Sequence, residues 1–149
     1  MIQVKVKKLH HAAVIPEYQT EGAACFDLHA VTGTNYPLHP CIGFPEVIRT
    51  GLSFEIPAGH VMLIFSRSGH GFNHDTRLSN CVGVIDSDYR GEVKVKLTRD
   101  EGSSNLLPIH TGDRIAQAMI IPIPHVALIE AEELSNTDRG VNWYGSTGK

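Results

Sequence analysis

Hydrophobic and polar residues alternate over several short stretches of the chain, and this pattern predicts β-strands. Ile2, Val4 and Val6 alternate with polar neighbours, which indicates a first strand with one buried face. The same alternation recurs over residues 51–56, where a Pro-Ala-Gly turn ends it. Residues 61–65 are continuously apolar, as is typical of a strand buried on both faces.

The pattern continues in the second half of the chain. Residues 115–123 are apolar apart from Gln117, which predicts another buried strand. A buried glutamine needs a hydrogen-bond partner, and the backbone and a ligand or water both remain open as that partner. Residues 31–49 are rich in glycine and proline, so we expect loop with short strand pieces there. Residues 126–134 permit either a helix, by their Ala and Glu content, or a further strand.

Many short strands with almost no helical periodicity predict an all-β fold. We expect a jelly-roll-like β-sandwich or barrel over residues 1–135, followed by an arm over 136–149. The arm is polar and glycine-rich, and it carries the only tryptophan, Trp143, next to Tyr144. Such an aromatic pair is suited to stacking on a ligand. We therefore predict that the arm orders on binding, and a disordered terminus is the alternative.

One acidic turn lies between two predicted strands. Two carboxylates, a tyrosine and an arginine at positions 86–90 separate the apolar stretch 82–85 from the strictly alternating stretch 92–97. Loops held by a rigid scaffold commonly carry catalytic groups. In an ordinary surface hairpin, by contrast, Asp and Gly would only complete the turn. The turn alone does not decide between these interpretations.

Composition narrows the classes of function. The chain has 149 residues, enough for one domain with its own core. A net charge of −3 and the lack of a membrane-length apolar run argue against nucleic acid or a membrane as a partner. Its three cysteines, Cys25, Cys41 and Cys81, form no Cys-x-x-Cys pair and support neither a disulfide framework nor a zinc ribbon. Free thiols and an N-terminus without a signal-peptide core predict a soluble protein of the cytoplasm or another intracellular compartment, a virus-infected host cell included.

Two further polar groups have a chemical use. Asp27 stands among small and apolar residues, so it needs a partner if it is buried; capping a turn and touching a cation through water both remain open. The stretch Arg67-Ser68-Gly69 follows a predicted buried strand and offers phosphate ligands, although three residues are too few to be specific. If a helical turn follows, its free N–H groups would add to an anion site, and His70 and His74 would share one face of it. No P-loop or dinucleotide-binding glycine pattern is present.

Five separated motifs resemble those of the trimeric dUTPase family, in that family's order and nearly its spacing. They are Ala24-Cys25-Phe26-Asp27-Leu28-His29-Ala30, Arg67-Ser68-Gly69, Asn80 through Gly91, Gly112-Asp113-Arg114-Ile115-Ala116-Gln117, and Arg139-Gly140 through Gly145-Ser146-Thr147-Gly148. The resemblance implies a jelly-roll subunit in a homotrimer whose active sites are shared between subunits. It also implies hydrolysis of dUTP to dUMP and pyrophosphate by Mg²⁺-assisted attack of water on the α-phosphorus. That reaction keeps uracil out of DNA and supplies dUMP for thymidylate synthesis.

The resemblance assigns a role to the acidic turn and to the strand before it. Asp86 would orient the attacking water and contact the sugar 3′-hydroxyl. Tyr89 would pack under the deoxyribose and leave no room for a 2′-hydroxyl. Asn80, Gly83 and Ile85 would lie in the segment that binds uracil, largely through the backbone.

The other motifs would bind phosphates, metal and base. Arg67, Ser68 and Gly69 would contact phosphates, Gln117 would hold the phosphate and water region, and Asp27 would face the water shell of Mg²⁺. In the arm, Arg139, Ser146 and Thr147 would clamp the outer phosphates, while Tyr144 beside Gly145 would cover the uracil. Whether Trp143 or Tyr144 stacks on the base stays open, because Asn142 and Trp143 replace the usual glycines. Cys25 also replaces a usual glycine, Ser66 a usual proline, and Asp75 a common glycine.

Three alternatives remain. The related dCTP deaminases share the fold, but the Asp86–Tyr89 pair and the Arg139 arm favour diphosphate hydrolysis. A catalytically silent nucleotide-binding or regulatory protein on the same scaffold is the second alternative. The third, a structural jelly roll such as a capsid-like protein, gives no reason for five polar motifs.

Overall fold

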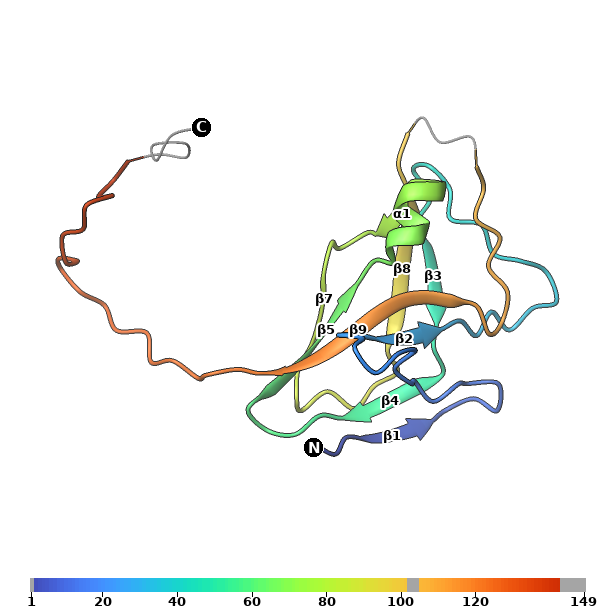
Figure 1. Ribbon diagram of the computed structural model, residues 1–149, viewed down its shortest axis with the longest axis horizontal. Helices are drawn as coiled ribbons and strands as arrows, with labels where there is room; N and C mark the ends of the chain where they lie inside the picture. The colour runs from blue at the N-terminus through green and yellow to red at the C-terminus, as the bar shows by residue number, and fades with distance from the viewer. Residues whose placement is uncertain (1, 102–104, 143–149) are drawn as a thin grey trace.

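The computed structural model describes residues 2–101 and 105–142 of the chain, shown in colour in Figure 1. Within these residues the chain forms nine short strands and one short helix. Their bounds are β1 Lys5–Lys8, β2 Phe26–His29, β3 Glu46–Arg49, β4 Leu52–Glu55, β5 His60–Phe65, α1 Ser68–His74, β6 Thr76–Leu78, β7 Gly83–Ile85, β8 Lys94–Arg99 and β9 Arg114–Pro122. The prediction of an all-β fold is confirmed.

The strands form three antiparallel sheets around one core. The sheet orders are β1-β4, β2-β9-β5-β7 and β3-β8-β6, and every strand pair is antiparallel. The core takes fully buried side chains from all three sheets: Leu28, Ile48, Leu52, Met62 and Ile115 each expose less than 2% of their surface. Burial of these aliphatic residues is the main force that holds the sheets together.

The acidic turn connects two of these sheets. β7, before the turn, pairs only with β5 among the described strands, whereas β8, after it, pairs with β3 and β6. The alternative of an ordinary hairpin, in which the flanking strands would pair with each other, is therefore wrong. Alternation along a strand reports which face is buried, but it does not report the pairing partner.

The helix α1 is the main departure from the predicted all-strand pattern. A helical turn after Arg67, considered above only as a condition for an anion site, is present and runs for seven residues. It ends at Asp75, whose φ of +47° lies in the left-handed region and whose N–H bonds to the Gly71 carbonyl. No residue of α1 is buried, so the helix has no apolar stripe that periodicity could detect.

The segment after β9 leaves the body of the molecule (Figure 1). Residues 126–134 form neither the helix nor the strand considered for them, and every described residue from 122 to 142 is exposed. Apolar side chains are among them: Val126 is 73% exposed, Leu128 94% and Ile129 85%. No helix in residues 2–101 and 105–142 is long and apolar enough to cross a membrane. The predicted division at residue 135 stays a prediction.

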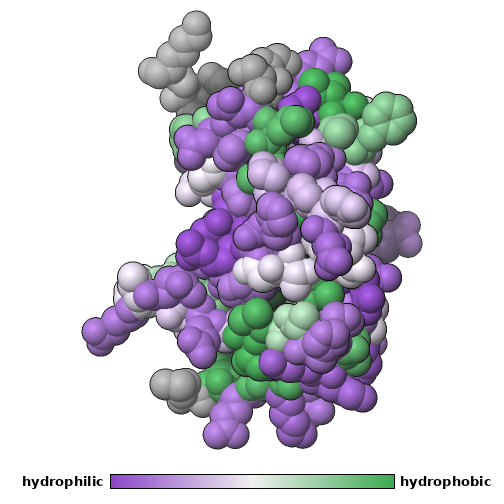
Figure 2. Space-filling model, turned by 90° about the vertical axis from the view of Figure 1, so that its right-hand side faces the viewer, coloured by the Kyte–Doolittle hydropathy of each residue, from purple (hydrophilic) through white to green (hydrophobic). Residues whose placement is uncertain are grey.

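Apolar surface is also present on the body itself. On the face shown in Figure 2, hydrophobic residues gather near the lower and upper ends, with polar residues between them. One apolar pocket of about 440 Å³ lies beside β1 and is lined by Val4, Val6, Tyr18, Phe54 and Ile120 among others. The N-terminal strand thus buries one face, as its alternation predicts, but only in part.

Candidate functional site

Asp27 of β2 lies between two arginines. Its Oδ1 accepts a hydrogen bond from Arg67 Nε at 3.1 Å, and its Oδ2 accepts one from Arg114 Nη1 at 3.2 Å. Asp27 is only 7% exposed, so both arginines offset the cost of burying its charge. The carboxylate therefore bonds side chains from the ends of two other strands, β5 and β9, instead of the backbone of a turn.

Arg67, Ser68 and Gly69 stand where β5 ends and α1 begins. The Arg67 carbonyl accepts the first helical hydrogen bonds, from the N–H groups of His70 and Gly71 at 3.1 and 3.2 Å. Ser68 and Gly69 are exposed, and a side chain added at Gly69 would meet nothing within 4 Å. The segment therefore presents a hydroxyl and an open stretch of backbone next to an oriented arginine.

Gln117 of β9 lies opposite Asp27 on one side and Phe65 on the other. Its Nε2 donates to the Ser66 carbonyl at 2.8 Å, so the backbone satisfies the amide nitrogen. The Ser66 hydroxyl in turn accepts the Leu78 N–H at 2.9 Å. Ser66 is a supporting residue that sequence reasoning noted only as a departure, and its position directly before Arg67 was the available signal.

A pocket of about 300 Å³ adjoins this group. Arg67, His70, Asp113 and Arg114 line it together with residues 107–109. Burial, and after it the charge of Arg67, lowers the pKa of His70 from its ordinary 6.5 to about 4. The imidazole is therefore neutral at pH 7, and its buried Nδ1 has no hydrogen-bond partner within the described part of the chain. Arg114 was quoted in a motif but not predicted as a site residue.

The acidic turn holds the second group. Asp86 and Tyr89 line one pocket of about 340 Å³, together with Val84, Ile85 and residues 92–94. The backbone brings them together because the Tyr89 N–H bonds to the Asp86 carbonyl at 3.2 Å. The Tyr89 hydroxyl donates to the Glu92 carbonyl at 3.1 Å, which fixes the ring. The Asp86 carboxylate is on an exposed residue, so water can reach it.

Asn80, Gly83 and Ile85 line a neighbouring pocket of about 280 Å³. This pocket and that of Asp86 have Val84, Ile85 and Lys94 in common, so the same residues border both. Asn80 Nδ2 donates to the Val82 carbonyl at 3.3 Å. Gly83 is buried, and an added Cβ would lie 3.1 Å from the Ile64 Cβ. The missing Cβ at Gly83 thus lets β7 pack closely against β5 at this point.

The predicted residues therefore fall into two groups. Asp27, Arg67 and Gln117 belong to the first, and Asp86 and Tyr89 to the second; the pocket beside Arg67 has no lining residue in common with the two pockets at the acidic turn. Arg139 is exposed and lies in a turn, in which the Asn142 N–H donates to the Arg139 carbonyl. Trp143, Tyr144, Gly145, Ser146 and Thr147 lie outside the described residues.

Residues 2–101 and 105–142 hold no cluster of three or more His, Cys, Asp or Glu that could bind a metal ion. The one buried carboxylate of the first group, Asp27, already accepts two hydrogen bonds from arginines. This donor set suits contact with a metal through water and does not suit a cage of protein ligands.

Comparison with known proteins places this arrangement in a family. A sequence model of the dUTPase family matches residues 11–148. The deoxyuridine 5′-triphosphate nucleotidohydrolase of Nautilia profundicola is 46% identical over 148 residues, which cover 99% of this chain and 100% of that protein. The protein of the same name from Helicobacter hepaticus is 42% identical over 147 residues, covering 99% of this chain and 89% of its own.

Solved structures show the same fold. The dUTPase of Staphylococcus bacteriophage 80alpha, solved with dUPNHPP, superposes with a TM-score of 0.87 at 24% identity over the whole of both chains. A mutant dUTPase of phage phi11 of S. aureus, in which the coordination of a structural Mg(II) ion was described, gives 0.74 at 23% identity, covering 89% of this chain and 98% of its own. With the family match over nearly its whole length, the chain belongs to the dUTPase family.

Proposed function

We propose that this protein hydrolyses dUTP to dUMP and pyrophosphate. Full-length relatives named as deoxyuridine 5′-triphosphate nucleotidohydrolases support this activity. Within the structure, the observation that carries it is the pocket that Asp86 and Tyr89, two residues of one turn, line together. An acid for water and an aromatic surface for a sugar are the two groups that the reaction needs there.

Asp86 acts as the general base. Hydrolysis at the α-phosphorus requires a water molecule in line with the leaving pyrophosphate, and little covalent chemistry from the protein. An exposed carboxylate on a turn fixed at both ends can hold that water within hydrogen-bond reach, roughly 2.6–3.2 Å, and accept its proton. Tyr89 forms the floor under the deoxyribose, where a ribose 2′-hydroxyl would collide with the ring.

Arg67 and Ser68 bind the phosphates. A guanidinium has five N–H donors, and Arg67 uses two nitrogens for Asp27 and for the Arg114 carbonyl. Asp27 therefore orients Arg67 while leaving it further donors for phosphate oxygens. Gln117 closes this region from β9, since its Nε2 is tied to Ser66 and its Oε1 is left to accept from water.

Mg²⁺ is the cofactor that we propose. It prefers phosphate oxygens and retained waters as ligands, so most of its shell would come from the nucleotide and solvent. Asp27 would face that water shell, and the metal, when bound, would neutralise charge on the phosphates. The absence of a carboxylate cage from residues 2–101 and 105–142 agrees with this arrangement.

We further propose a homotrimer with active sites shared between subunits. Two features support it. The pocket beside Arg67 and the pocket at the acidic turn have no lining residue in common. The segment after β9 also carries exposed apolar side chains away from the body. Each group would be completed by another copy of the chain. The arm would then close with Arg139, Ser146 and Thr147 on the phosphates and Tyr144, next to Gly145, over the base.

An intracellular compartment suits the free thiols of Cys25, Cys41 and Cys81. The ligand that we propose is dUTP.

The test is a panel of deoxynucleoside triphosphates with Mg²⁺, scored separately for pyrophosphate and ammonia. We expect pyrophosphate from dUTP and little from dCTP or dTTP. Ammonia from dCTP would show a deaminase instead, and binding of dUTP without either product would show a silent nucleotide-binding protein.

A further inference from the structure

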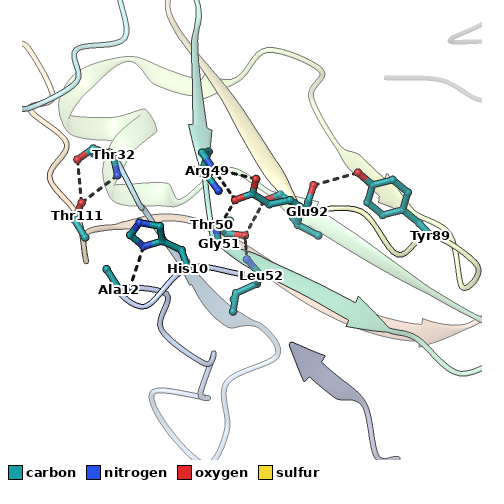
Figure 3. A network of polar contacts seen from close by, with 11 residues as sticks. His10, Ala12, Thr32, Arg49, Thr50, Gly51, Leu52, Tyr89, Glu92 and Thr111 are labelled. Carbon is teal, nitrogen blue, oxygen red and sulfur yellow. Dashed lines mark hydrogen bonds and ion pairs between the residues drawn. The ribbon is translucent and has the colours of Figure 1, made fainter. Parts of the chain in front are cut away.

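Glu92, between the acidic turn and β8, joins that turn to the end of β3 and to the β3–β4 turn (Figure 3). Both of its carboxylate oxygens accept from Arg49 Nε, at 3.0 and 3.1 Å, and Oε1 also accepts the Gly51 N–H at 2.9 Å. Its backbone carbonyl accepts the Tyr89 hydroxyl at 3.1 Å. One residue therefore binds the β3–β4 turn through its side chain and the proposed sugar-binding tyrosine through its backbone.

One partner of the carboxylate, the Gly51 N–H, has a fixed place. Gly51 has a φ of +67°, and an added Cβ would lie 2.9 Å from the Ala13 Cβ, so only glycine fits this position. Its N–H is thus a fixed donor. The Glu92 side chain is only 13% exposed, so water competes little for the carboxylate. In contrast, the Lys5–Glu55 pair on β1 and β4 is at least half exposed on both sides.

Neighbouring contacts fasten the same part of the turn. Ser53 Oγ donates to the Arg90 carbonyl at 2.7 Å, the Val93 N–H donates to the Leu52 carbonyl at 2.9 Å, and Thr50 Oγ donates to the Val93 carbonyl at 2.7 Å. The end of the turn near Tyr89 is therefore held by residues 49–53, whereas its beginning is held by β7 and its partner β5. Among the described residues, the Glu92–Arg49 pair is the only ion pair between the turn and residues 49–53.

The backbone holds the Tyr89 ring on one side, while the residue as a whole is 44% exposed. An added Cβ at Gly91 would lie 2.4 Å from the Tyr89 hydroxyl oxygen and 2.6 Å from its Cζ. The ring thus packs directly against the Gly91 backbone, with its hydroxyl bound to the next carbonyl along the chain. Any shift of residues 91–92 must displace the ring.

We propose that Glu92 is a positioning residue that sets the discrimination between 2′-deoxyribonucleotides and ribonucleotides. Its carboxylate, held by Arg49 and Gly51, fixes the backbone of residues 91–92, and this backbone fixes the Tyr89 ring at the height where a 2′-hydroxyl collides with it. Glu92 acts through Tyr89 and not as the base. The inference rests on the proposed hydrolysis of dUTP and on the place of Tyr89 under the sugar.

The test compares the ratio of kcat/KM for dUTP to kcat/KM for UTP in the wild type and in variants. In Glu92→Gln the remaining side-chain oxygen can still accept the Gly51 N–H. The other carboxylate oxygen becomes an NH₂ group, which cannot accept a hydrogen bond from Arg49. We expect the ratio to fall by roughly tenfold, because small misplacements at a binding site cost one to two orders of magnitude. The change should come from a higher KM for dUTP and better use of UTP, with kcat for dUTP changed less, since Asp86 is left in place.

Two further variants make the test specific. Gly91→Ala leaves the carboxylate intact but displaces the ring, so it should lower the ratio in the same way. Glu55→Gln removes a carboxylate from an exposed pair and should leave the ratio unchanged. An unchanged ratio in a folded Glu92→Gln protein, with active wild type, overturns the inference alone. A wild type that does not hydrolyse dUTP overturns the proposed function and the inference with it.

Discussion

The hydroxyl of Ser66 accepts the backbone N–H of Leu78 at 2.9 Å, and this bond joins the end of β5 to the end of β6. Leu78 is 2% exposed, so water does not replace the bond if it is lost. The carbonyl of Ser66 also holds Gln117. One serine thereby ties the strand before Arg67 to two of its neighbours.

Replacing Ser66 should therefore destabilise the fold. Ser66→Ala leaves the buried Leu78 N–H without its acceptor, which we expect to lower the free energy of unfolding by about 1–3 kcal/mol. Ser66→Pro, which introduces the residue usual in the family, should cost at least as much in this chain. Urea unfolding measures both, with the exposed Ser135→Ala as the control. Equal stability of Ser66→Ala and wild type would show that the bond does not matter.

Asp86→Asn should nearly abolish turnover and leave binding of dUTP largely intact. The amide cannot accept the proton of the attacking water, and general bases contribute roughly 10²–10⁴-fold to rate. Pyrophosphate release and calorimetric titration with a non-hydrolysable dUTP analogue separate the two effects. Asp88→Asn, an exposed acid in the same turn, is the matched control. Release of pyrophosphate at a near-normal rate would mean that another group is the base.

Asp27→Asn should lower both the stability of the fold and the affinity for the phosphates of dUTP. The change leaves Arg67 and Arg114 facing an amide that can accept from only one of them, at an expected cost of about 1–3 kcal/mol in the free energy of unfolding. Arg67 would lose its orientation, so KM for dUTP should rise. Asp100→Asn is the control, because Asp100 pairs with Arg77 on the surface, where water screens the two charges. A loss no larger than that of Asp100→Asn would argue against the double ion pair.

Acid should destabilise the protein through His70. Its pKa is about 4 in the folded chain, below the ordinary 6.5, so between these values the unfolded chain binds a proton that the folded chain does not. Stability should fall as the pH drops from 6.5 to 4, with no further contribution from His70 below that window. His70→Gln should flatten the dependence in part, and burial lowers the pKa of His29 as well, so some slope should remain. Unfolding curves across this range test it, with the exposed His125→Gln as the control; identical pH profiles for wild type and His70→Gln would contradict it.

Removing residues 139–149 should reduce the catalytic rate while the trimer persists. Closure of a segment over bound nucleotide excludes water and completes the site, and the truncation deletes Arg139 and every other arm residue proposed to contact dUTP. Turnover and sedimentation measure the two properties on one sample. Undiminished turnover would contradict the proposal that the arm closes over the nucleotide. Dissociation into monomers would indicate that the arm is needed for assembly of the trimer.

The sequence predicted most strands but not how they pair. Alternation located β4 and β8, and the apolar runs located β5 and β9, because each reports burial within a few residues. β6 and α1 lack such a pattern: β6 is three residues long and α1 buries none of its residues. The polar residues of the site stood out by type and order along the chain.

The hydrogen-bond partners of these polar residues are distant in the sequence. Glu92 is one of several polar residues in an alternating strand, and nothing near it points to Arg49, 43 positions earlier. The same holds for Asp27 and Arg114, which are 87 positions apart. Such partners follow from strand pairing, which a single sequence does not determine.

The acidic turn crosses from one sheet to another, and this limits where the chain can accept inserted residues. In a free hairpin, an added residue only enlarges a loop, and surface loops generally tolerate this. Between Ile85 and Lys94, an added residue would displace the turn from its bonds to Gly51 and Ser53, or would have to be absorbed by the register of β7 on β5 or of β8 on β3 and β6. A shift by one residue would turn the inward-facing Val95 and Leu97 outward. We therefore expect insertions to be accepted in the exposed segment 33–36 and rejected between 86 and 92, so that the spacing from Asp86 to Glu92 is set by the architecture as much as by the chemistry.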